Sequence, residues 1–181
     1  HYARLHPAEL KLSNRKRCLR DLKELGYQVG TGFMVGSPWQ TMANLLEDLA
    51  FIRELQPQMI GIGPFIPHHA TPFKNYPAGT LEQTLTLLSV LRLMFPKVLL
   101  PATTALGTIV PNGRELGILA GANVVMPNLS PADVRQNYLL YDNKLCSGAE
   151  AAEAKNDLAA RLHSIGYEIA DRTVSYTNLT L

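Results

Sequence analysis

Apolar residues recur along much of the chain at steps of three and four, the spacing of one helical face. The clearest case predicts a helix over 80–95, which Pro96 ends. Its apolar stripe consists of Leu81, Leu85, Leu88, Leu91 and Phe95. Similar spacing predicts further helices over 13–26, 41–55, 113–120 and 149–165, and a short one that begins at Ser130.

Residues that start and stop helices flank these stretches. Ser13 and Thr41 are the N-caps expected for the first two helices, and Gly26 is expected to end the first. Thr80 and Gln83 form a capping-box pair at the start of the helix over 80–95. These short-range signals fix where the helices are expected to begin.

Short apolar runs lie between the predicted helices, at 27–35, 59–63, 98–100 and 123–126. The runs are continuous rather than alternating, which is typical of strands buried on both faces. Such strands alternating with helices predict an α/β fold of parallel strands joined by helical crossovers. The stretch 64–79 is rich in proline and has no clear period, so we expect a functional loop there.

No shift in composition divides the first part of the chain, so 1–147 is expected to form one unit. The remainder, 148–181, is expected to form a C-terminal helix and a loosely held polar tail. Because the sequence begins with His1 rather than methionine, we expect that a preceding segment is missing.

Composition narrows the function classes further. The chain has 181 residues, 46% of them apolar, and 17 Lys and Arg against 15 Asp and Glu give a net charge of +2. That charge is too small to indicate a nucleic-acid or membrane-surface partner, and no apolar run is long enough to span a membrane. Two cysteines, Cys18 and Cys146, are too few for a disulfide scaffold, so a cytoplasmic location is expected, although a single disulfide stays open.

Four segments that follow predicted strands are rich in Gly, Pro and hydroxyl residues: 36–41, 64–72, 101–107 and 127–130. Ligands of parallel α/β folds bind beyond the C-terminal ends of the strands, so these segments are candidate ligand loops. Ordinary tight turns between strands and helices would show the same composition. Both interpretations stay open from the residues alone.

Two candidates for anion binding stand out. Thr103 and Thr104 could donate to a carboxylate or a phosphate, or one of them could cap the next helix. Arg15 lies in the first turn of a predicted helix, where an anion is favoured, although a solvated surface arginine would look the same. His68 and His69 are adjacent, so on an extended chain they would point apart, and we expect no metal site there.

Several motifs in order carry a family resemblance. The segment 32–41, Gly-Phe-Met-Val-Gly-Ser-Pro-Trp-Gln-Thr, resembles the fifth-strand motif of radical S-adenosylmethionine (SAM) enzymes of the biotin synthase type. Together with 60–68, 101–111, 121–128 and 135–141, it is similar to the HydE-type family of radical SAM enzymes, which mature FeFe hydrogenase. The resemblance extends from about Leu12 to Cys146.

This resemblance implies a (β/α)8 barrel of which the chain supplies strands five to eight. In that family a Cys-x3-Cys-x2-Cys loop holds a 4Fe-4S cluster that binds and reductively cleaves SAM. The resulting 5′-deoxyadenosyl radical attacks a cysteine-derived, iron-bound small molecule. The barrel shields the radical from water.

The resemblance also implies a role for individual residues. The residues expected to bind SAM are Arg15, Met34, Gly36 and Ile66. Those expected to line the substrate cavity are Met59, Thr103, Thr104, Tyr138 and Tyr141. No catalytic residue is expected within this chain.

The chain departs from the family at its cysteines. It contains no Cys-x3-Cys-x2-Cys, so the 4Fe-4S cluster and bound SAM are expected of the parent enzyme rather than of this fragment alone. Cys146 matches the first cysteine of an accessory cluster found in some relatives, but no other cysteine follows it. We therefore expect the fragment to be inactive alone, to pair with a missing N-terminal half-barrel, or to form a homodimer of half-barrels.

Two alternatives stay open. One lies within the same family: a biotin synthase or a methylornithine synthase-type enzyme, which shares the barrel and the fifth-strand motif. The other belongs to a different class: a self-contained α/β ligand-binding module without redox chemistry. A cysteine motif in the upstream part of the gene would distinguish the two classes.

Overall fold

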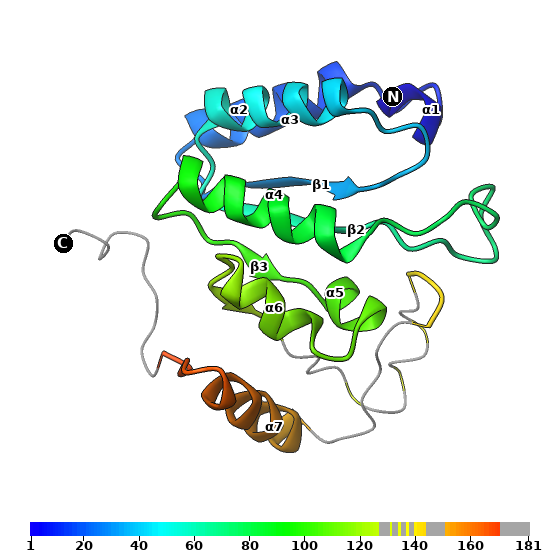
Figure 1. Cartoon of the computed structure of the whole chain (residues 1–181). Coiled ribbons are helices and arrows are strands. Elements are labelled where there is room, and N and C mark those ends of the chain that lie inside the picture. Colours follow the sequence, from blue (N-terminus) through cyan, green and yellow to red (C-terminus); the bar gives the residue numbers. More distant parts are fainter. Residues whose placement is uncertain (127–130, 132–133, 135–136, 138–139, 144–150, 171–181) are drawn as a thin grey trace.

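The computed structural model describes residues 1–126, 131, 134, 137, 140–143 and 151–170 (Figure 1). Its described strands are β1 (Gly30–Val35), β2 (Met59–Pro64), β3 (Pro101–Ala102) and β4 (Val124–Val125). Its described helices are α1 (Tyr2–Leu5), α2 (Leu12–Glu24), α3 (Met42–Leu55), α4 (Leu81–Met94), α5 (Thr104–Ile109), α6 (Gly113–Leu119) and α7 (Ala151–Ser164).

All four strands run parallel. β1 pairs with β2 in a register that joins Gly30 to Met59 and Val35 to Pro64, and β3 pairs with β4. A parallel bridge between Met59 and Leu99 places the approach to β3 beside β2. The backbone of Ile60 donates to Leu99 O over 2.9 Å at this junction. The expected parallel strands with helical crossovers are thus present.

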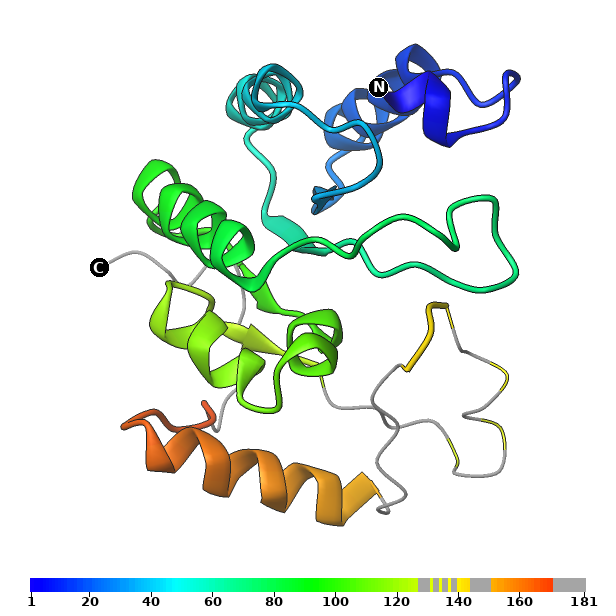
Figure 2. The same cartoon turned by 45° about the vertical axis from the view of Figure 1, so that its right-hand side comes forward.

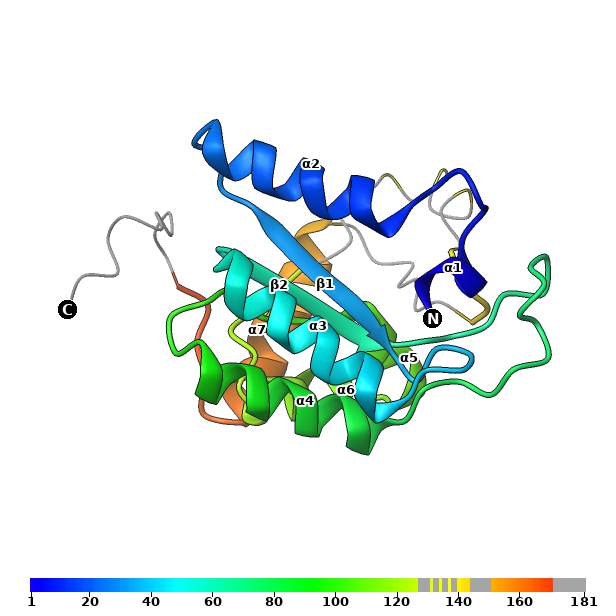
Figure 3. The same cartoon turned by 90° about the horizontal axis from the view of Figure 1, so that it is seen from above.

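The helices lie around the outside of the strands. α3, α4, α6 and α7 follow one another in an arc around them (Figure 2). Seen from above, β1 lies between α2 and α3 (Figure 3). Arg20 on α2 binds Glu54 on α3, and Lys23 donates to the last carbonyl groups of α3, so these two helices are linked at one end.

The helix caps follow the sequence only in part. Thr41 caps α3 in a full capping box with Asn44, as expected for a Thr at this position. Thr80 Oγ1 accepts from the backbone of Gln83 at the start of α4. The expected cap of α2 is wrong: its N-cap is Lys11, whose extended backbone makes no side-chain cap, so Ser13 lies inside the first turn.

The third strand begins later than the apolar run 98–100 indicates. Leu99 makes a single bridge, and the paired strand is Pro101–Ala102. Asn123 explains the shift, because its side-chain oxygen accepts from Leu100 N and its backbone donates to Leu100 O. Leu100 itself is fully buried, so the apolar run marks the core although it does not mark the ladder.

The core lies between the strands and the helices. Ile60 and Ile62 of β2 are buried against Leu88 and Leu91 of α4, and Leu158 of α7 joins the same cluster. Alternate residues of β2 are only half-buried, since they face away from the helices. β1 and β2 therefore have one face packed on the core and one face left open.

Several expectations lie on parts of the chain outside the described residues. They are the helix beginning at Ser130, the polar tail beyond 170, Tyr138 and Cys146. The division of the chain at 147 also stays a prediction. Among the helices that the structure describes, none is long and apolar enough to cross a membrane.

Candidate functional site

The open face of β1 and β2 carries few side chains. The register pairs Gly30 with Met59, Gly32 with Gly61 and Met34 with Gly63. These six residues share one face of the two strands. Met34 is 46% exposed there, and Met59 is half-buried. The structure thus places the two methionines expected in the SAM and substrate cavities on the same glycine-rich face.

The glycines allow the two strands to approach closely. A Cβ on Gly32 would overlap the carbonyl of Gly61, whereas a Cβ on Gly61 would meet nothing within 4 Å. Gly32 is therefore required by the backbone of the neighbouring strand. Gly61 is not, and its missing side chain leaves the face open.

Thr103 follows β3 and lies against Gly63 of β2. A Cβ on Gly63 would lie 2.6 Å from Thr103 Oγ1. This hydroxyl oxygen is buried and has no hydrogen-bond partner among the residues that the structure describes. Thr103 is the N-cap of α5, yet its side chain does not cap the helix. The capping interpretation of the Thr pair is therefore wrong for Thr103.

Thr104 is the first residue of α5 and is half-buried. Its carbonyl oxygen accepts from Thr108 Oγ1 over 3.1 Å, so its backbone belongs to the helix. The short helix 104–109 was not among the helices expected from the sequence. It holds the two threonines at the C-terminal end of the strands, as a ligand loop requires.

The turn after β1 is fixed by Gln40, a residue that the sequence did not single out. Its side chain accepts from Gly36 N over 2.7 Å and donates to Met34 O over 2.8 Å. Gly36 has φ of +74°, and a Cβ there would lie 2.5 Å from the Cα of Gly79. Gly36 is thus demanded by backbone packing, whatever it contributes to a ligand.

The loop 64–79 begins and ends at this same turn. Phe65 N donates to Val35 O and Gly79 N donates to Phe65 O, each over 2.8 Å. These bonds tie both ends of the loop to the end of β1. Half-buried Ile66 follows directly, so the structure brings Met34, Gly36 and Ile66 to one end of the strands.

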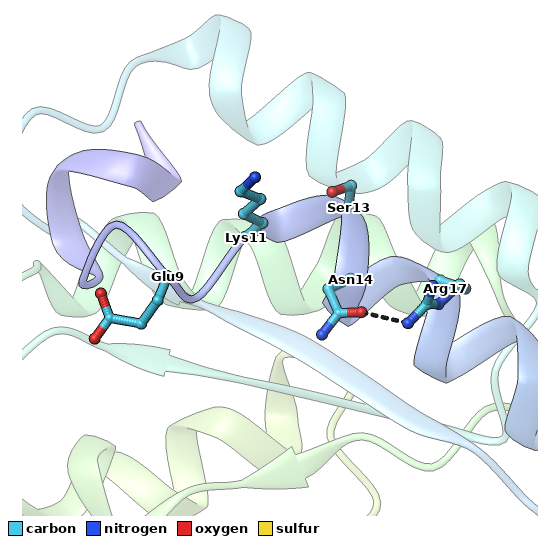
Figure 4. A pocket seen from close by; sticks show the side chains of 5 residues that line it. All are labelled: Glu9, Lys11, Ser13, Asn14 and Arg17. Atoms are coloured by element: carbon cyan, nitrogen blue, oxygen red, sulfur yellow. Dashed lines mark hydrogen bonds between the residues drawn. The ribbon is translucent and has the colours of Figure 1, made fainter.

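Arg15 lies exposed on α2, outside the strand ends that hold the other expected SAM residues. An open hollow of about 320 Å³ lies nearby, at the start of the same helix (Figure 4). Its lining residues are Glu9, Lys11, Ser13, Asn14 and Arg17. None of the expected site residues that the structure describes lines it.

Tyr141 is half-buried and has a charge interaction with Arg114 on α6. Burial lowers the pKa of Arg114, and the nearby Arg161 cation lowers it further, while Glu115, Tyr141 and Asp157 oppose the shift. The structure thus places Tyr141 near α6. Tyr138, its expected partner in closing the cavity, lies outside the described residues.

The two adjacent histidines do not point apart, so that expectation is wrong. Their rings stack with centroids 4.3 Å apart, because the chain turns after His68 instead of continuing extended. The turn is closed by Thr71, whose backbone and hydroxyl both donate to His68 O. Asp142 lies beside them: its Oδ1 is 2.7 Å from His69 Nδ1 and its Oδ2 accepts from His69 N.

The hydrogen bond from His69 holds the pKa of the Asp142 carboxyl below its usual 3.8. Asp142 also donates its backbone N–H to Pro67 O over 3.2 Å. No local pattern could indicate this contact, because the two residues are 73 positions apart. Asp142 is therefore a chemistry-bearing residue that the sequence alone did not reveal.

Comparison with known proteins places these observations in a family. No protein-family model matches the chain. The chain is 48% identical over 145 residues to the FeFe hydrogenase maturase subunit HydE of Thermotoga maritima, a match that covers 80% of this chain and 41% of HydE. The chain belongs to the radical SAM family.

Other radical SAM relatives agree. The chain is 33% identical to the 3-methylornithine synthase of Methanosarcina barkeri over 131 residues, which are 72% of this chain and 37% of the synthase. The crystal structure of methylornithine synthase (PylB) matches with a TM-score of 0.70 and 28% identity, covering 88% of this chain and 46% of PylB. The chain thus spans less than half the length of each of these relatives.

The radical SAM chemistry of the relatives implies SAM and a 4Fe-4S cluster in the parent enzyme. The residues of this chain do not fit the cluster. Its two cysteines lie 128 positions apart in the sequence, Cys18 is exposed on α2, and Cys146 lies outside the described residues. The open glycine face and the unpartnered Thr103 hydroxyl do fit small-molecule binding.

Proposed function

We propose that this chain forms the part of a HydE-type radical SAM enzyme that binds SAM and the carboxylate of a small-molecule substrate. The observation that carries the proposal is the buried Thr103 hydroxyl against Gly63, which has no partner among the described residues, in a chain 48% identical to HydE. A hydroxyl donor left without a partner costs free energy, which a bound acceptor would recover.

The four strands would be the fifth to the eighth of a (β/α)8 barrel. Three observations support this placement: the strands are parallel, one face of β1 and β2 is packed on the core, and the opposite face of these two strands is open. In such barrels the inner face and the C-terminal strand ends carry the site. The other half-barrel, with the cluster loop, would come from the part of the family that this chain does not match.

Met34, Gly36 and Ile66 would line the SAM site, and Arg15 would bind its carboxylate. Gln40 would hold Met34 and Gly36 in position, because its side chain is hydrogen-bonded to the backbone of both residues. In the parent enzyme SAM and the cluster supply a 5′-deoxyadenosyl radical. This chain's own residues would bind and orient SAM and the substrate. They would also exclude water, which preserves a reactive radical.

Thr103 and Thr104 would hold the substrate carboxylate, and Met59, Tyr138 and Tyr141 would line the same cavity. The hydroxyl of Thr103 would donate to the carboxylate, and the missing side chain of Gly63 lets this hydroxyl lie close against β2. A cysteine-derived, iron-bound small molecule is the substrate class that the resemblance to HydE favours.

Substitution of Thr103 tests the proposal, in a protein that contains the whole barrel. Thr103→Val removes the donor at nearly constant volume, and Thr103→Ser retains it. We expect Thr103→Val to raise the KM for the carboxylate-bearing substrate at least tenfold, about 1.4 kcal/mol, while substrate-independent SAM cleavage persists. Thr103→Ser should behave like the parent protein.

Stability distinguishes this role from a structural one. Because the hydroxyl has no partner among the described residues, Thr103→Val should leave the free energy of unfolding unchanged or raise it. A KM that does not respond to Thr103→Val would overturn the proposed carboxylate role. A loss of stability would indicate that the hydroxyl supports the fold instead.

A second candidate reaction is that of a methylornithine synthase. It is favoured by the structural match to PylB, with a TM-score of 0.70. The same whole-barrel protein assayed with the substrate of each relative would separate the two. The higher identity to HydE, 48% against 33%, leads us to expect turnover of the HydE substrate.

A further inference from the structure

His68, His69 and Asp142 bring three possible metal ligands to one place. One ligand atom from each residue can be chosen so that all three lie within 4.8 Å of one another. Two imidazole nitrogens and one carboxylate oxygen are a common donor set for zinc and other first-row transition metals.

Hydrogen bonds of the local backbone bring these side chains together before any ion binds. Thr71 closes the turn on His68 O, and Ala70 N donates to His68 Nδ1 over 3.1 Å, which orients that ring. Asp142 is fastened from both sides, by His69 N at 2.8 Å and by its own N–H to Pro67 O. The three side chains therefore meet as a consequence of ordered hydrogen bonds.

The cluster is accessible to ions from solvent. The side chain of His69 is 76% exposed and that of Asp142 is 38% exposed. Ligand atoms around a tetrahedral zinc ion lie about 3.3 Å apart, so the largest separation here must close by about 1.5 Å. Exposed side chains can close this distance by rotating about their side-chain bonds, without moving the backbone.

We propose that His68, His69 and Asp142 bind a divalent transition-metal ion such as Zn²⁺, with water completing the coordination. The ion takes the place of the proton between His69 Nδ1 and Asp142 Oδ1, and that proton moves to Nε2 of the neutral ring. The bound ion fastens the loop 64–79 to the segment 140–143. This inference does not depend on the proposed SAM or substrate roles.

Direct metal binding tests the proposal. The full chain, freed of metal by a chelator and with both cysteines replaced by serine, is titrated with Zn²⁺ against a fluorescent zinc indicator. Co²⁺ is then added separately, and its visible absorption reports the coordination number. We expect one ion per chain and a spectrum of four- or five-coordinate Co²⁺ with nitrogen and oxygen ligands.

Matched variants separate this site from general surface binding. His69→Ala and Asp142→Asn should each weaken Zn²⁺ binding at least tenfold, and His68→Ala should do the same. Asp142→Asn keeps an oxygen that can accept from His69 but loses the charge, so the fold is retained. His163→Ala, on exposed α7, is the control and should bind as the parent does.

Two outcomes would overturn the proposal. One is binding of equal affinity in the parent, His69→Ala and Asp142→Asn. The other is the absence of saturable Zn²⁺ binding by the folded parent, which would show that the cluster is a hydrogen-bonded contact only. Circular dichroism of each variant confirms that a lost site is not a lost fold.

Discussion

Arg161 of α7 donates two hydrogen bonds to the carboxylate of Glu115 on α6. Its Nε binds Oε1, and its Nη2 binds Oε2 over 3.0 Å and also the carbonyl oxygen of Pro111 over 2.6 Å. The Glu115 side chain is only 10% exposed, so its carboxylate is largely removed from water, whereas the Arg161 side chain is 37% exposed. It joins the last described helix to the body of the fold.

Breaking this pair should destabilise the protein. Arg161→Ala leaves the Glu115 carboxylate buried without its partner, which we expect to lower the free energy of unfolding by about 2–3 kcal/mol. The control is Arg20→Ala, which removes a short but exposed ion pair with Glu54. That variant should cost less than about 1 kcal/mol. Urea denaturation of both variants measures the difference, and equal losses would contradict the role assigned to burial.

A pair of facing glycines should respond very differently to the same substitution. A Cβ at Gly32 would overlap the carbonyl of Gly61, so Gly32→Ala must push β1 and β2 apart. We expect a loss of about 2 kcal/mol or more, within the range of strained core substitutions. Gly61→Ala, whose Cβ would meet nothing within 4 Å, is the matched control and should change stability little.

The sequence predicted local features better than distant ones. The cap of α3 by Thr41 was predictable because it involves only the next three residues. The spacing of leucines that predicted α4 is equally local. The prediction for Ser13 was wrong because its residue type permits a cap, whereas the helix begins at Leu12 with Lys11 as its N-cap.

The candidate site depended on contacts that no short pattern shows. Thr103 was a candidate from its sequence position, but its burial against Gly63 requires β2 and β3 to be neighbours. The stacking of His68 on His69 required a turn in place of an extended chain. Asp142 lies 73 residues from His69 and was found only from the structure.

Asp48 should make the protein's stability depend on pH. Burial raises the pKa of this half-buried carboxyl on α3 above its usual 3.8, and Lys16 on α2 only partly opposes the shift. The folded state therefore favours the protonated form. The resulting stabilisation is complete below pH 3.8 and is lost as the pH rises through the higher folded-state pKa.

Asp48→Asn removes this penalty at neutral pH. We expect the variant to be more stable than the parent at pH 7, by less than about 1 kcal/mol because the group is half-exposed. The difference should shrink as the pH is lowered towards 4. Denaturation curves across this range test the sign, with Asp21→Asn on exposed α2 as the control for a simple change of net charge.

The unpaired edge of β1, together with the open face beside it, should drive self-association when this chain is studied alone. β1 pairs with β2 and, in the part of the chain that the structure describes, with no strand on its other side. Such an edge can pair with a second chain, and the exposed Met34 adds apolar surface next to it. We expect a dimer by light scattering at micromolar concentration, as two half-barrels closing on each other would give. A stable monomer would contradict this expectation.

This chain alone should not cleave SAM. Reductive cleavage needs a 4Fe-4S cluster, and the cysteines here do not form the Cys-x3-Cys-x2-Cys loop that holds it in the family. After reconstitution with iron and sulfide under reducing conditions, we expect no 5′-deoxyadenosine by chromatography.

Addition of a separately produced N-terminal half-barrel that carries the cysteine loop should restore cleavage, because it supplies the missing ligands and closes the open face. Formation of 5′-deoxyadenosine by the chain alone would mean that it binds a cluster in another way. A complemented barrel that stays inactive would instead contradict the assignment of this chain to the SAM-binding half.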